Sequence, residues 1–105
     1  MLSIRFGDDR EWWASGSIFD RLFAAGLRSE VIPPELAEMQ HLANANGGLD
    51  FGLLDAKQAA ELTIAIRDAA RQEITELASL SLCPDDQSYL ARLTRLLEVV
   101  PPHAE

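Results

Sequence analysis

The chain has 105 residues, of which 48% are hydrophobic and 25% are charged, a balance typical of one folded domain rather than a disordered segment. Its formal net charge of −8 disfavours binding to a nucleic acid backbone and favours a basic partner. No apolar run is long enough to cross a membrane, and acids replace the apolar core of a signal peptide after residue 6. We therefore expect a single domain over residues 1–105, in the cytoplasm and without a membrane partner. The use of Arg, Ala and Leu beside a single Lys is typical of a high-GC bacterial coding sequence.

The first elements are a short strand and a helix. Residues 2–6 alternate apolar and polar side chains, which predicts a strand. Ser17 and Asp20 have the spacing of a capping box, and apolar residues then recur at helical spacing. The sequence predicts a helix over about residues 17–25, with Gly26 as its stop.

A second helix is predicted to begin at Pro33-Pro34 and to end at the Asn- and Gly-rich residues 44–48. Its predicted buried stripe contains Leu36, Met39, Leu42 and Ala43. Residues 49–54 are compatible with a short extended piece, and pairing with the N-terminal strand is one hypothesis for it.

The dominant predicted element is a helix that Asp55 and Gln58 cap and that continues to about residue 82. An apolar stripe runs along it, flanked by alanines that permit close approach of another backbone. A last helix follows Cys83 and ends before Pro101-Pro102. The predicted fold is mainly all-α, with four helices, one long central helix and a minor N-terminal extended element.

Few residues are candidates for chemistry. Glu38 and His41 have the Glu-x-x-His spacing of di-iron bundle proteins, but such sites need two copies of the motif. Cys83 is the only cysteine, so it has no partner for an intramolecular disulfide or a zinc thiolate pair. Nothing in the sequence forces His41 and Cys83 together. We therefore expect no metal, no cofactor and no catalytic residue.

The two tryptophans are adjacent, so their side chains diverge. We expect one indole to pin the N-terminal arm to the core and the other to be exposed for recognition. The candidate partner-binding residues are Trp12 and Trp13 with the neighbouring acids Asp8, Asp9 and Glu11.

Three functions remain open. The first is a non-enzymatic acidic binding module, such as an immunity protein, an inhibitor or an adaptor, that associates with a basic protein. The second is a homodimer held by the apolar stripes of the long and last helices. The third is a small-molecule or enzymatic pocket that uses His41 or Cys83.

Overall fold

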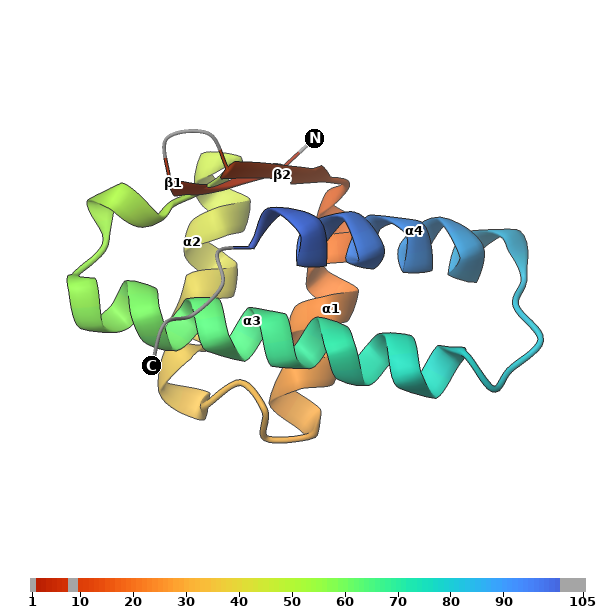
Figure 1. Cartoon of the computed structure of the whole chain (residues 1–105). Coiled ribbons are helices and arrows are strands. Elements are labelled where there is room, and N and C mark those ends of the chain that lie inside the picture. Colours follow the sequence, from red (N-terminus) through yellow and green to blue (C-terminus); the bar gives the residue numbers. More distant parts are fainter. Residues whose placement is uncertain (1, 8–9, 101–105) are drawn as a thin grey trace.

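The computed structural model describes residues 2–7 and 10–100, which form a mainly helical fold with a small sheet (Figure 1). The strands are β1 (Leu2–Gly7), β2 (Arg10–Ala14) and β3 (Gly48–Asp50). The helices are α1 (Gly16–Arg28), α2 (Glu38–Asn46), α3 (Ala56–Leu77) and α4 (Pro84–Val99), with short 3-10 turns η1 (Pro34–Leu36) and η2 (Phe51–Leu53). No helix in these described ranges combines the length and the apolar character that crossing a bilayer requires.

The sheet has the strand order β2-β1-β3. The predicted strand at residues 2–6 is present as β1, and it pairs antiparallel with β2. The hypothesis that residues 49–54 pair with the N-terminal strand is confirmed only at their start, because β3 lies parallel to β1 with Ile4 opposite Leu49, whereas Phe51–Leu53 form the turn η2. β2, which contains both tryptophans, was not predicted as a strand.

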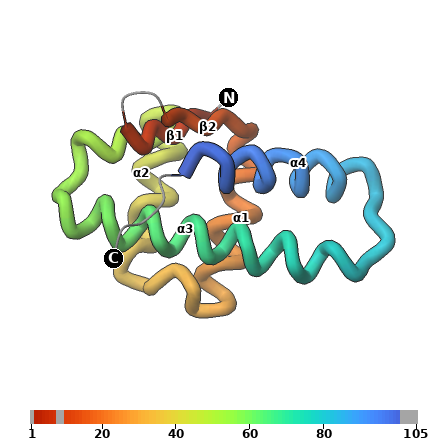
Figure 2. Tube along the Cα trace, in the orientation of Figure 1, coloured from red at the N-terminus to blue at the C-terminus, as the bar shows by residue number. Residues whose placement is uncertain are grey.

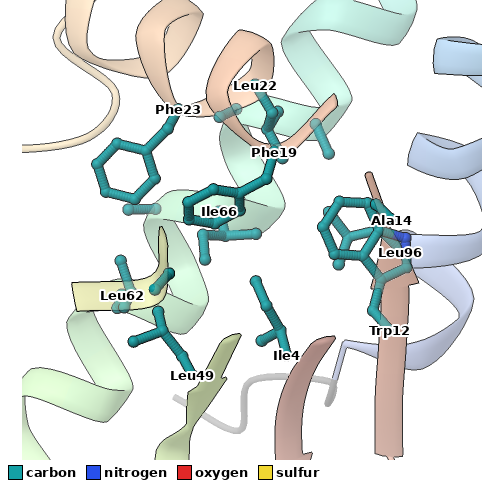
Figure 3. Packing of buried hydrophobic residues seen from close by; sticks show 14 of the residues in the cluster. Ile4, Trp12, Ala14, Phe19, Leu22, Phe23, Leu49, Leu62, Ile66 and Leu96 are labelled. Carbon is teal, nitrogen blue, oxygen red and sulfur yellow. The ribbon is translucent and has the colours of Figure 1, made fainter. Parts of the chain in front are cut away.

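The inner face of the sheet packs against the helices. Figure 3 shows Ile4 and Leu49 pointing from the sheet toward Phe19 of α1 and toward Leu62 and Ile66 of α3. α3 also contacts α4, and α4 lies against β2. The chain trace thus brings its C-terminal helix beside its N-terminal hairpin (Figure 2).

Trp12 fastens that hairpin to α4. Its side chain is fully buried, and its indole N–H donates a 2.8 Å hydrogen bond to the carbonyl oxygen of Arg92. The guanidinium of Arg92 in turn donates to the carbonyl oxygen of Trp13 at 3.4 Å. Arg10 donates to the carbonyl oxygen of Val99 at 3.2 Å, near the end of α4. These bonds cover the edge of β2 that does not pair with β1, and they confirm that one indole pins the N-terminal arm.

The ends of α1 differ from the prediction. Ser15, rather than Ser17, is the N-cap, and its hydroxyl accepts from the amide of Ile18 at 3.2 Å. Asp20 instead accepts from the side-chain amides of Gln40 and Asn44 on α2, at 3.0 and 2.9 Å, so it links two helices.

Gly26 does not stop α1, which continues to Arg28. A Cβ at this position would lie 2.6 Å from Cγ1 of Ile32 and 3.2 Å from Cβ of Ala69 on α3. The glycine therefore permits close packing inside the helix, and Glu30 adopts the left-handed conformation, φ 65°, after the helix ends.

The long helix begins as predicted, because the Asp55 carboxylate accepts from the amides of Lys57 and Gln58. The predicted end of this helix was wrong by five residues, since α3 ends at Leu77 rather than near residue 82. The Ser79 hydroxyl donates to the carbonyl oxygen of Glu76, and the Leu80 amide bonds to Leu77 in a tighter turn. Such local bonds compete with the helix and leave Leu80 outside the core.

Candidate functional site

The face of the sheet that points away from the helices carries side chains in two rows. Register places Trp13, Ser3 and Gly48 in one row across β2, β1 and β3. Glu11, Arg5 and Asp50 form the next row. We call these six residues the outer sheet face, and it is distinct from the inner face that Trp12 and Ile4 occupy because successive side chains of a strand alternate.

Trp13 is the exposed member of the tryptophan pair. Its side chain is 47% exposed, whereas Trp12 has no exposed surface. The expectation of one buried and one exposed indole is thus confirmed. Of the two tryptophans predicted to bind a partner, Trp12 is committed to the core, and only Trp13 presents an indole at the surface.

The charges of the outer sheet face alternate across the strands. Arg5 lies between Glu11 and Asp50, and its Nη2 is 4.0 Å from Oε2 of Glu11. A pair this long between partly exposed groups contributes little to stability, so both charges remain available to a partner. Asp50 is held in place because its Oδ1 accepts from the amide of Gly52 at 2.9 Å. The row has two acids and one base.

An open hollow of about 510 Å³ adjoins this row. It is lined by residues of the outer sheet face and, on the β3 side, by Leu42, Leu53 and Leu54. Leu53 is 84% exposed and Leu42 is 45% exposed, so apolar surface is accessible there. The volume is within the range of sites that bury a ligand or a partner side chain.

Leu42 was predicted to belong to the buried stripe of the second helix, and that prediction was wrong. Met39 and Ala43, four residues apart, are the buried residues of α2. Leu42 is about 100° away from Ala43 around the helix and therefore faces away from the core. The sequence reasoning also missed Leu53 and Arg5. The alternation over residues 2–6 already places Arg5 on the outward side of its strand, whereas no pattern marks Leu53.

The remaining predicted residues are not gathered at this face. Asp8 and Asp9 lie outside the described residues. His41 is an exposed residue of α2, and Cys83 is exposed at the N-cap of α4. Neither residue lines the hollow beside β3. Within residues 2–7 and 10–100, no three His, Cys, Asp or Glu side chains form a group that could hold a metal ion.

A second polar cluster joins α1, α3 and α4 around Tyr89. The hydroxyl of Tyr89 donates to Oε1 of Glu73 at 2.7 Å. The guanidinium of Arg21 lies 4.0 Å from the centre of the Tyr89 ring and 2.9 Å from Oδ1 of Asp86. This cluster brings side chains from three helices together.

The protonation of this cluster follows from its contacts. Burial, reinforced by Glu73, raises the pKa of Tyr89 far above its usual range. The hydrogen bond from Arg21 is the main cause that lowers the pKa of Asp86. Tyr89 is therefore a neutral hydrogen-bond donor. This state fits a structural role in linking α3 and α4 better than a role as proton acceptor or nucleophile.

Comparisons of this chain with protein-family models, with curated proteins and with solved structures found no match.

Proposed function

We propose that the protein is a non-enzymatic binding module that contacts a partner protein through the outer sheet face. The observation that carries the proposal is the position of Trp13. Its half-exposed indole shares a sheet face with Glu11 and lies one strand from Ser3, which lines the hollow together with Leu42 and Leu53. Exposed indoles are enriched at binding hot spots.

A basic partner fits the charge of this surface best. The chain carries a formal charge of −8, and the row on the outer sheet face contains Glu11 and Asp50 with only Arg5 between them. Opposite charge on a partner would speed association and make it sensitive to salt. Immunity proteins, inhibitors and adaptors are the classes that this size and charge favour. The bacterial origin and the cytoplasmic location stay predictions from composition.

The test is affinity capture from a lysate of the source cells with matched variants. Wild type and Trp13→Ala are compared with Leu80→Ala, which removes an exposed apolar side chain from the link between α3 and α4 (Figure 1). We expect wild type and Leu80→Ala to retain one stoichiometric basic protein that high salt releases, and Trp13→Ala to lose it. Equal retention by a folded Trp13→Ala variant would remove the outer sheet face from the proposal.

The pocket hypothesis with His41 or Cys83 stays a prediction. It is tested with His41→Ala and Cys83→Ser, because the variant that removes a side chain with a chemical role should lose the biological activity. The binding proposal expects both variants to capture the partner as wild type does.

A further inference from the structure

The outer sheet face has a projection at β2 and a hollow over β1 and β3. Trp13 projects from β2, and the hollow extends over β1 and β3 as far as Leu42, Leu53 and Leu54. Since neighbouring strands are about 4.8 Å apart, the backbones of β2 and β3 are about 10 Å apart across β1. A surface that carries both parts can fit a copy of itself.

We propose that a second copy of this chain covers the outer sheet face when the partner is absent, and that the two copies are related by a two-fold axis. This inference goes beyond the proposed function and does not depend on it. In a two-fold interface each contact occurs twice, with the roles of the two copies exchanged.

The axis that fits runs parallel to the strands, between β1 and β3. Two sheets that pack face to face keep their strands nearly aligned. β1 of one copy then lies over β3 of the other, because the axis exchanges these two strands. Arg5 meets Asp50 of the second copy, since the two residues are register partners at the same level of the sheet. Each copy therefore forms the same opposite-charge contact.

The same axis places Trp13 beyond β3 of the second copy, where Leu42 and Leu53 line the hollow. Ser3 lies over Gly48, which has no side chain to hold the sheets apart. The contact thus joins a large projection to an apolar hollow and a small side chain to a glycine.

Other surfaces suit a second copy less well. The apolar stripes of α3 and α4, on which the homodimer hypothesis rested, are buried within one chain at Leu62, Ile66, Leu93 and Leu96. The outer edge of β2 is occupied by its bonds to α4, so the sheet does not continue there into another sheet. The outer sheet face remains as a surface with both apolar and charged groups accessible.

Net charge gives this dimer a distinctive salt dependence. Two chains that each carry −8 repel one another at long range, and salt screens that repulsion. We expect salt to strengthen the dimer while it weakens the complex with a basic partner. The opposite effects of salt therefore distinguish the dimer from the complex with a basic partner, although both use the outer sheet face.

The first test is sedimentation equilibrium of the full chain from micromolar to millimolar concentration, at low and high salt. We expect a reversible monomer–dimer equilibrium that high salt shifts toward dimer. Trp13→Ala and Leu53→Asp should each raise the dissociation constant at least about tenfold, whereas Leu80→Asp should leave it unchanged. A monomer at every concentration, or a dimer that Trp13→Ala and Leu53→Asp leave intact, would overturn the proposal.

The second test uses the reciprocal charge contact. Arg5→Glu alone places two acids opposite each other, and Asp50→Lys alone places two bases opposite each other. A mixture of the two variants restores opposite charges at both contacts. We expect each variant to be monomeric where wild type is dimeric, and the mixture to form a heterodimer. Circular dichroism and thermal melts establish that both variants are folded, which matters because Asp50→Lys removes the bond to Gly52. Folded variants that dimerise alone as wild type does would exclude this interface.

The outcomes are independent of those for the proposed function. A dimer with no captured partner supports the second copy alone, and a captured partner with a monomeric chain supports the binding module alone.

Discussion

The indole N–H of Trp12 and the carbonyl oxygen of Arg92 are joined by a hydrogen bond of 2.8 Å across a sequence separation of 80 residues. Arg92 also donates through its guanidinium to the carbonyl oxygen of Trp13. One helix residue thus holds both strand residues, although only Trp12 enters the core. The two indoles therefore have separable roles, which substitution can distinguish.

Trp12→Ala should lower the free energy of unfolding by about 3 kcal/mol or more, because it leaves a cavity in place of a buried indole. Trp13→Ala should change that free energy by about 1 kcal/mol or less, since the side chain is half-exposed. Urea denaturation followed by circular dichroism measures both values. Equal losses would mean that both indoles are core residues. As a second readout, Trp13→Phe leaves Trp12 as the remaining tryptophan. The fluorescence emission of this variant should lie at the shorter wavelength that is typical of a buried indole.

Gly26→Ala should destabilise the protein even though alanine is the better helix former. The added methyl group collides with Ile32 and approaches Ala69 of α3 to 3.2 Å. Overpacking of this kind costs about 1–3 kcal/mol, against a gain of about 1 kcal/mol in helix propensity. Chemical denaturation gives the net change. The matched control is the same substitution in an Ile32→Val background, where we expect a smaller cost because the neighbour has lost a methyl group. A stabilised Gly26→Ala would show that the helix has room at this point.

Gly48→Ala should be more damaging than Gly47→Ala. Gly47 ends α2 with φ 74° and has open space around it, so a methyl group there costs about 1 kcal/mol. Gly48 has φ 150°, and a Cβ would collide with the carbonyl oxygen of Ser3 in β1. We expect a loss above about 2 kcal/mol and faster hydrogen exchange in β1. Similar melting temperatures for the two variants would argue against the parallel pairing of β1 with β3.

Tyr89 should make the protein sensitive to alkaline pH. Its folded-state pKa is raised, so the folded chain keeps a proton that the unfolded chain releases above about pH 10. Stability that is fully present below this pH is therefore lost as the pH rises above it. Tyr89 is the only tyrosine, so tyrosinate absorbance reports this residue alone. We expect the absorbance to appear together with unfolding, rather than as a separate transition in the folded protein.

Tyr89→Phe provides the control for that prediction. The variant should lose about 1 kcal/mol at neutral pH with the hydrogen bond to Glu73, and it should lose less stability than wild type above pH 10. A tyrosinate transition near the usual pKa in folded wild-type protein would contradict the buried environment of Tyr89.

Local sequence signals were sufficient for much of the fold. Alternation over residues 2–6 predicted β1, and Asp55 predicted the start of α3, because both signals act within a few residues. The alanines predicted to permit close helix packing do so at Ala69, opposite Gly26. β2 was not predicted, because its five residues include two adjacent tryptophans and show no regular alternation of apolar and polar side chains.

Signals with two physical meanings led to the errors. Gly26 could serve as a helix stop or as a close contact, and only the position of Ile32 decides between them. Asp20 could cap α1 or bond to α2, and the presence of Gln40 and Asn44 decides that case. At the candidate site, the sequence singled out Glu11 and Trp13, and the structure places both on the outer sheet face; their binding of a partner stays a prediction. The hollow was not predicted, because Leu53 joins that surface only through the pairing of β3 with β1.

The bonds between the hairpin and α4 also constrain the order of folding. Trp12 finds its acceptor 80 residues later, and Arg10 bonds to Val99 across 89 residues. During synthesis the β1–β2 hairpin therefore emerges well before α4, the helix that covers it, and Trp12 lacks its acceptor until α4 has been made. Contacts of such long sequence separation slow folding. The docking of α4 should thus be a late step, and a nascent chain that stalls before α4 should remain sensitive to protease.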